Sequence, residues 1–218
     1  MPGVSSPAEV VPSILSADLA DLRAQVREVV DAGARTVHID VMDGHFVPAL
    51  SMGPGVVSAL REHFAGLVLD VHLMVERPER HVADFVRAGA DHVLVHAEAT
   101  PHVHLALQRI RELSARAGLV VNPATPLTIF EEVVVGEALV MSVNPGAGGQ
   151  AFIPESLDRL KRLRKLLGPD TPIEVDGGID VRTAPGAAKA GASMLVAGSA
   201  VFGEPDPGAA FRRIADAL

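Results

Sequence analysis

Short apolar runs alternate along the chain with longer segments that mix apolar and polar residues. Eight runs rich in Val, Ile and Leu recur at intervals of about 20 to 35 residues, at 10–15, 36–41, 67–74, 92–96, 118–122, 138–143, 172–176 and 193–198. Apolar residues recur with helical spacing between them, most clearly at 19–33, 79–89, 102–118 and 155–168. The pattern therefore predicts strands and helices in alternation, and the helical pattern is weakest at 127–137.

Three helical segments end in nearly the same four letters. DAGA (31–34), RAGA (87–90) and KAGA (189–192) each come just before a predicted strand. Glycine commonly follows the last turn of a helix. The repeated phrase thus predicts the same helix-to-strand turn at three places in the chain.

Strands that alternate with helices indicate parallel βαβ units. Eight such strands without a linker or a change of composition favour one closed (β/α)8 TIM barrel, a single α/β domain that spans residues 1–218. A doubly wound open sheet is the alternative, although no predicted strand is followed by G-x-G-x-x-G at the start of a helix.

Composition narrows the classes of function. With 48% hydrophobic residues the chain is not disordered, and a net charge of −8 with 3% aromatic residues argues against a nucleic-acid partner. The absence of cysteine excludes disulfides, thiolate nucleophiles and Cys-ligated zinc. No run is long enough to span a membrane and the first 13 residues do not resemble a signal peptide, so we expect a cytoplasmic protein with no membrane partner.

Ionisable residues gather late in three predicted strands, where a barrel builds its active site. Side chains two apart share a strand face, which pairs His38 with Asp40, Asp70 with His72, and Glu174 with Asp176. Taken singly, each histidine could be a hydrogen-bonded core residue and each aspartate a helix cap. Together, His38, Asp40, His72 and Asp176 predict a divalent metal site for Zn, Mn, Fe or Co, among which spacing does not choose.

Glycine-rich turns follow the last three predicted strands. They read NPGAGG (144–149), DGG (176–178) and AGS (197–199). Such turns bring backbone N–H groups close to an anion, and the late loops of α/β barrels frequently hold a phosphate. A single glycine turn would be explained as a connection, but three in succession favour a phosphate site, and the acidic net charge does not oppose it.

These residues resemble the ribulose-phosphate 3-epimerase family over about residues 11–202. The motifs that carry the resemblance are PSILSAD (12–18), VHIDVMDGHFVP (37–48), DVHLMV (70–75), NPATP (122–126), MSVNPGAGGQAFIP (141–154), EVDGG (174–178) and VAGSAVF (196–202). The resemblance implies a metal-dependent isomerase of the pentose phosphate pathway. Such an enzyme interconverts D-ribulose 5-phosphate and D-xylulose 5-phosphate through a C2–C3 enediolate.

Carried over position by position, the resemblance makes His38, Asp40, His72 and Asp176 the metal ligands. It also makes Asp40 and Asp176 the acid/base pair. The residues implied in substrate binding are Ser13, His72, Gly146, Ala147, Gly148, Gly149, Gly177, Gly178, Gly198 and Ser199, with Met42, Met74 and Met141 around the sugar. The chain departs from the family pattern at Ala147, where an aromatic residue is common, and at Ala49, where Asn is common.

Three alternatives stay open at this point. One is 3-epimerisation of a six-carbon ketose phosphate such as allulose 6-phosphate, which uses a similar site. Another is lyase or aldol chemistry in a related barrel such as a hexulose-phosphate synthase, against which the paired aspartates weigh. The last is a sugar-phosphate sensor without activity. For an epimerase the expected partner is a small ketose phosphate, and the sequence leaves a homo-oligomer open.

Overall fold

The computed structural model describes residues 8–218. Residues 1–7 lie outside the described residues. They make up the larger part of the opening 13-residue segment, which is not expected to be a signal peptide. Among residues 8–218, no helix has the length and apolar character that crossing a bilayer requires.

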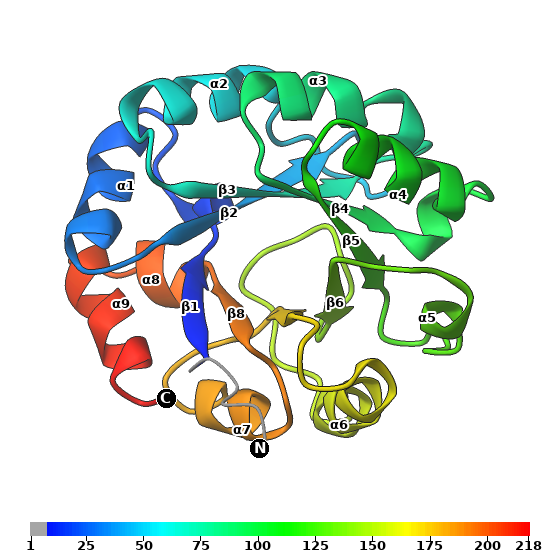
Figure 1. Ribbon diagram of the computed structural model, residues 1–218. Coiled ribbons are helices and arrows are strands. Elements are labelled where there is room, and N and C mark those ends of the chain that lie inside the picture. The colour runs from blue at the N-terminus through cyan, green and yellow to red at the C-terminus, as the bar shows by residue number, and fades with distance from the viewer. Residues whose placement is uncertain (1–7) are drawn as a thin grey trace.

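Eight parallel strands form one sheet in the order β1-β8-β7-β6-β5-β4-β3-β2 (Figure 1). Their bounds are β1 Glu9–Pro12, β2 Thr36–Met42, β3 Val68–Met74, β4 His92–His96, β5 Arg116–Val121, β6 Glu137–Met141, β7 Ile173–Asp176 and β8 Met194–Ala197. A single parallel bridge between Ser13 and His38 joins the edges next to β1 and β2. The predicted TIM barrel is confirmed, and the doubly wound alternative is wrong because each strand lies beside its neighbours in the chain.

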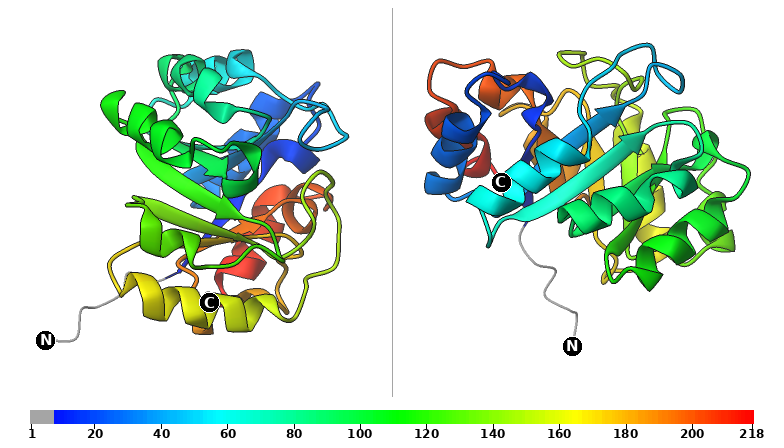
Figure 2. Two further views of the ribbon diagram at one scale, coloured as in Figure 1. Left: turned by 90° about the vertical axis from the view of Figure 1, so that its right-hand side faces the viewer. Right: turned by 90° about the horizontal axis from the view of Figure 1, so that it is seen from above.

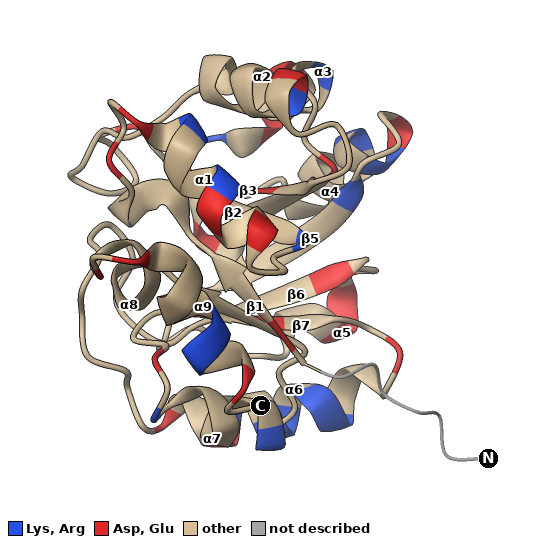
Figure 3. Cartoon of the chain, turned by 90° about the vertical axis from the view of Figure 1, so that its left-hand side faces the viewer, with Lys and Arg blue, Asp and Glu red and all other residues tan. Residues whose placement is uncertain are grey.

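Helices surround the strands on the outside (Figures 1 and 2). Their bounds are α1 Leu22–Asp31, α2 Pro54–His63, α3 Val82–Ala88, α4 Val103–Glu112, α5 Ile129–Glu132, α6 Ser156–Leu167, α7 Ala184–Lys189, α8 Ser199–Phe202 and α9 Pro207–Ala215, with short 3-10 turns η1 Ile14–Ser16, η2 Pro78–Arg80 and η3 Ala97–Ala99. In α6, Leu160 and Leu163 are buried whereas Lys161 and Lys165 face solvent. Figure 3 shows basic residues on the outward helices α6 and α9.

The three glycine turns before strands share one backbone conformation. Gly33, Gly89 and Gly191 have φ angles of 114°, 113° and 113°, a region that favours glycine. Two of these turns are clamped by an arginine of an earlier helix. The Arg61 guanidinium donates to the Gly89 carbonyl at 2.8 and 3.2 Å, and that of Arg164 to the Gly191 carbonyl at 2.9 and 3.1 Å. The predicted repetition of this turn is confirmed.

Some predicted elements extend too far. The first strand ends at Pro12, because the Ser13 hydroxyl accepts a hydrogen bond from the Leu15 N–H and starts the turn η1. The helix expected at 102–118 ends at Glu112, since Ser114 adopts a φ of 66° and β5 begins two residues later. These boundaries depend on local turns that apolar periodicity does not register.

The helix expected at 127–137 shrinks to the four residues of α5. Val133 is extended, with φ −137° and ψ 150°. It opens a run of three β-branched valines, which disfavour a helix and precede β6. The weak helical pattern of this segment therefore corresponds to a short helix followed by extended chain.

The inside of the barrel holds ionisable groups near the amino ends of the strands. We call Asp70, His92, Glu137 and Glu174 the barrel floor, and all four are buried. His92 Nδ1 lies 3.2 Å from Glu137 Oε2 and 3.6 Å from Asp70 Oδ1, and the Arg116 guanidinium lies 3.8 Å from Glu137. Burial alone would lower the pKa of His92, but the Asp70 and Glu137 carboxyl groups raise that pKa to about 10.

A raised histidine pKa makes stability depend on pH. Protonated His92 stabilises the fold fully below its unfolded pKa of about 6.5, and this contribution is lost as pH rises through about 10. We expect the free energy of unfolding, measured with urea, to fall between pH 7 and pH 10, and to fall less in His92→Gln. The chain has no Cys or Tyr to titrate in this range. Equal pH slopes in the parent and in His92→Gln would contradict the assignment, and exposed His63→Gln is the control.

Candidate active site and metal centre

Three strands bring the four predicted metal ligands together at the carboxyl end of the barrel. His38 and Asp40 lie on β2, His72 on β3, and Asp176 is the last residue of β7. The register of β2 and β3 pairs Asp40 with His72 directly across the sheet. One ligand atom from each of the four residues lies within 4.8 Å of the other three. The structure thus brings together the whole predicted set.

The distances centre on His72 Nδ1. This nitrogen lies 3.0 Å from Asp40 Oδ1, 3.3 Å from His38 Nε2 and 3.8 Å from Asp176 Oδ2. Ligands at about 2.1 Å from a tetrahedral ion are about 3.4 Å apart, so these separations match the edges of a coordination polyhedron. Two imidazoles and two carboxylates, without sulfur, fit a divalent ion of the transition series or zinc.

Each histidine has its second ring nitrogen bonded away from the cluster. His38 Nδ1 lies 2.7 Å from Asp70 Oδ2, so Nε2 is the nitrogen that faces the other ligands. His72 Nε2 lies 2.8 Å from Nε2 of His96, so Nδ1 is the nitrogen that faces them. Asp70 and His72 lie on one strand face, as predicted. Asp70 is not one of the four predicted metal ligands, but it contacts one of them, His38.

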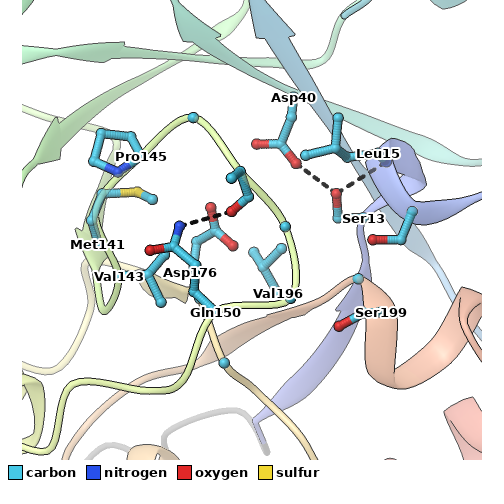
Figure 4. A pocket seen from close by; sticks show the side chains of 18 of the residues that line it. Ser13, Leu15, Asp40, Met141, Val143, Pro145, Gln150, Asp176, Val196 and Ser199 are labelled. Carbon is cyan, nitrogen blue, oxygen red and sulfur yellow. Dashed lines mark hydrogen bonds between the residues drawn. The ribbon is translucent and has the colours of Figure 1, made fainter. Parts of the chain in front are cut away.

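Ser13 joins the site to the closure of the barrel. Its hydroxyl donates to Asp40 Oδ2 at 2.6 Å (Figure 4). Its backbone pairs with that of His38 in the bridge between the two sheet edges. Ser13 also lines the pocket described below, in agreement with the expected place beside the substrate. Closing the barrel therefore orients one of the two aspartates.

The two aspartates differ in their electrostatic surroundings. Burial opposes ionisation of Asp40, but the charge of His38 and the hydrogen bond with His38 bring the pKa of Asp40 far below its usual range. Burial, followed by the nearby charge of Asp40, raises the pKa of Asp176 to about 7. Two carboxyl groups with different proton affinities consequently face one space, as acid/base chemistry requires.

A pocket connects the aspartates to the three glycine-rich loops (Figure 4). The predicted residues that line it are Ser13, Asp40, Met42, Met74, Met141, Gly146, Ala147, Gly148, Gly149, Asp176, Gly177, Gly178, Gly198 and Ser199. No Lys or Arg is among the described residues of this lining. An anion at the glycine end would therefore be bound by backbone N–H groups.

Close approach explains why glycine occupies two of these positions. A Cβ atom on Gly177 would lie 2.5 Å from Val143 Cγ2, and one on Gly178 would lie 2.3 Å from the Phe152 nitrogen. Both residues also have positive φ angles, of 119° and 65°. The loop after β7 thus packs against the segment after β6 too tightly for any side chain.

Three residues of the site were not singled out from the sequence. Gln150 donates to the carbonyls of Asn144 and Ala147 at 2.7 and 2.8 Å, and so holds the NPGAGG loop in shape. His96 contacts His72, and Glu98 contacts His96 at 3.2 Å between Oε2 and Nδ1. Alternation along HVLVH (92–96) places His92 and His96 on one face, which is the signal that could have found His96.

Comparison with known proteins gives both a family and a fold. The model described as the ribulose-phosphate 3 epimerase family matches residues 9–202. The ribulose-phosphate 3-epimerase of Bacillus subtilis is 48% identical over 204 residues, covering 91% of this chain and 94% of the relative. That of Serratia marcescens is 50% identical over 202 residues, covering 90% and 96%. A 3-hexulose-6-phosphate synthase structure from Salmonella typhimurium, 19% identical, has a TM-score of 0.75 over 96% and 98% of the chains and shares the fold alone.

Proposed function

The chain belongs to the ribulose-phosphate 3-epimerase family and is an isomerase, and we propose that Asp40 and Asp176 exchange the proton on C3 of D-ribulose 5-phosphate. The observation that carries this proposal is the pair of carboxyl groups, from β2 and β7, that face one pocket. The names of the relatives support a pentulose phosphate over the six-carbon alternative. The same names weigh against lyase chemistry and against an inactive sensor.

Inversion at C3 needs a base on one face of the sugar and an acid on the other. Asp40 and Asp176 come from strands that are not adjacent in the sheet, so they approach the pocket from different directions. One carboxylate accepts the C3 proton, and the other carboxyl group delivers a proton to the opposite face. The reaction runs in both directions, and the two residues exchange roles with the epimer that is bound. Ser13 holds Asp40 in place through its hydroxyl.

We propose that His38, Asp40, His72 and Asp176 hold one divalent ion, for which Zn, Mn, Fe and Co are the candidates. The donor set and its separations support this assignment. When bound, the ion supplies Lewis-acid stabilisation of the negative charge that develops on the sugar oxygens. The ion would take the place of the proton on His38, so that both histidines would contribute neutral nitrogen ligands, and the aspartates combine ligation with proton transfer.

The phosphate is assigned to the loops after β6, β7 and β8. Gly146–Gly149, Gly177, Gly178 and Gly198 offer backbone N–H groups at one end of the pocket. Met42, Met74 and Met141 also line the pocket, where they would provide apolar contacts for the sugar carbons. This arrangement anchors the ketose phosphate and leaves C3 beside the carboxyl groups.

Metal removal tests the ligand assignment. We expect a chelator to abolish epimerisation of D-ribulose 5-phosphate, and one equivalent of a divalent ion to restore it. His72→Ala should lower both bound metal, measured by elemental analysis, and turnover. Exposed His104→Ala is the matched control and should change neither. Full activity in rigorously metal-free protein would exclude the ligand role.

Substitution of the aspartates tests proton transfer. Asp40→Asn and Asp176→Asn should each lower kcat by at least ~10²-fold, the low end for a positioned acid or base. The double variant should lose much less than the product of the two losses, because the residues act as a unit. Exposed Asp158→Asn is the control. Product formed in deuterated water should carry deuterium at C3, and near-normal turnover in either single variant would remove that aspartate from the mechanism.

A panel of substrates tests the phosphate site and the sugar length together. D-ribulose 5-phosphate should turn over well, allulose 6-phosphate less well, and unphosphorylated D-ribulose very poorly. Gly198→Val should raise KM steeply, because even a Cβ at this position lies 3.0 Å from Ser16 Oγ. Gly66→Val is the control, since a Cβ there meets nothing within 4 Å. Equal turnover of D-ribulose and its phosphate would refute the phosphate assignment.

A further inference from the structure

We propose that Glu98 and His96 are positioning residues that fix the tautomer of His72, so that its Nδ1 lone pair faces the metal site. The inference rests on the metal site proposed above, in which His72 is a ligand. It concerns two residues that are neither in the pocket lining nor in the four-residue ligand cluster. They form a relay, Glu98–His96–His72, that leads from the partly exposed Glu98, in the turn after β4, to the buried ligand cluster.

The relay begins with a group that only accepts hydrogen bonds. Glu98 is held by the Asn122 N–H at 2.8 Å and by the Thr125 hydroxyl, both on Oε1. Burial raises the pKa of Glu98, but hydrogen bonds from His96, Thr125 and the Asn122 backbone outweigh it and lower that pKa to about 2. The side chain is therefore an ionised carboxylate. Its other oxygen, Oε2, lies 3.2 Å from His96 Nδ1, which must carry the hydrogen of that contact.

The direction of each following bond then depends on the one before it. A neutral imidazole with hydrogen on Nδ1 has its lone pair on Nε2. His96 Nε2 lies 2.8 Å from His72 Nε2, so His72 must donate there and carry its hydrogen on Nε2. The lone pair of His72 is consequently on Nδ1, the atom 3.0 Å from Asp40 Oδ1 at the centre of the ligand cluster.

The two histidines of the relay lie inside the protein, where water cannot supply competing partners, whereas the Glu98 side chain is 24% exposed. His72 and His96 are both 0% exposed. Their rings stack with centroids 5.0 Å apart and an interplanar angle of 23°, and the Phe46 ring packs on His96 with a centroid distance of 4.7 Å. Without these partners, the hydrogen of His72 would go to Nδ1, where the Asp40 carboxylate 3.0 Å away would accept it. The Glu98 carboxylate thus selects the form of His72 that binds an ion.

A carboxylate also orients His38, but it contacts this histidine directly and not through a second imidazole. Its Nδ1 bonds directly to the Asp70 carboxylate at 2.7 Å, which leaves Nε2 for the metal site. The two histidine ligands therefore present different nitrogens, and a carboxylate decides each, Asp70 directly and Glu98 through His96. Such partners commonly contribute 10- to 100-fold to metal affinity.

Glu98→Gln is the sharpest test, because it changes the direction of the relay and keeps its shape. The Asn122 N–H is only a donor, so the Gln carbonyl must face it and the amide NH2 must face His96. His96 would then accept on Nδ1 and donate from Nε2, which forces the hydrogen of His72 onto Nδ1. We expect the affinity for Zn²⁺ or Co²⁺, measured by competitive titration, to fall roughly 10- to 100-fold.

Companion variants separate this effect from charge and from folding. Glu132→Gln removes an equal charge from a neighbouring exposed site and should leave affinity unchanged. His96→Leu removes the acceptor and should weaken binding as Glu98→Gln does, whereas His96→Gln, whose carbonyl oxygen can reach the place of Nε2, should restore most of it. The unfolding temperature of each metal-free variant reports any purely structural loss. Equal affinity in the parent, Glu98→Gln and His96→Leu would overturn the inference, as would equal weakening by His96→Leu and His96→Gln.

Nitrogen-15 NMR of the unmodified, metal-free protein observes the tautomers directly. We expect hydrogen on Nε2 of His72 and on Nδ1 of His96, and hydrogen on Nδ1 of His72 in Glu98→Gln. Hydrogen on Nδ1 of His72 in the parent protein would refute the relay even if no variant folds. Failure of the parent to bind any divalent ion would instead refute the proposed metal site, so the two failures are distinguishable.

Discussion

Burying carboxyl groups beside histidines inside a closed barrel is the constraint on which the rest of this structure depends. Asp40, Asp70, Glu137 and Glu174 are nearly inaccessible, and Asp176 is only partly exposed. A buried carboxylate is costly unless it is paired or hydrogen-bonded. The histidines of β2, β3 and β4 supply most of these contacts, so the interior is a network of titratable groups between apolar layers.

These titratable groups lie at two ends of the barrel, the floor and the mouth, and the two ends have different roles. At the floor, His92 and Arg116 stand near carboxyl groups that reach no substrate, which makes this end a matter of stability. At the mouth, Asp40 and Asp176 share a pocket with the glycine-rich loops. Asp70 and His38 connect the two ends, because one Asp70 oxygen contacts His38 and the other lies near His92. The contacts that orient the predicted metal ligands therefore connect directly to the contacts inside the barrel core.

Strands carry the two aspartates proposed for proton transfer, whereas loops carry the proposed anion site. The Ser13–His38 bridge closes the sheet where it also orients Asp40, so formation of the barrel and assembly of the site are one event. The loops of the proposed phosphate site are shaped by backbone requirements instead. Gln150 and the close contacts of Gly177 and Gly178 hold them, and no basic side chain lines this part of the described pocket.

The sequence by itself determined the eight strands, the three glycine turns and the four residues of the ligand cluster. These follow from local rules, because strand alternation decides which side chains point inward and parallel strands end at one mouth. Tertiary structure decided the ends of the helices near Ser114 and Val133, the arginine clamps on Gly89 and Gly191, and the partners of each histidine. A hydrogen bond such as that between His72 and His96 joins residues 24 apart in the chain, and Glu98, which contacts His96, is held by groups of the loop after β5. Spacing along the chain carries no record of such a contact, because it exists only once the strands have been placed side by side.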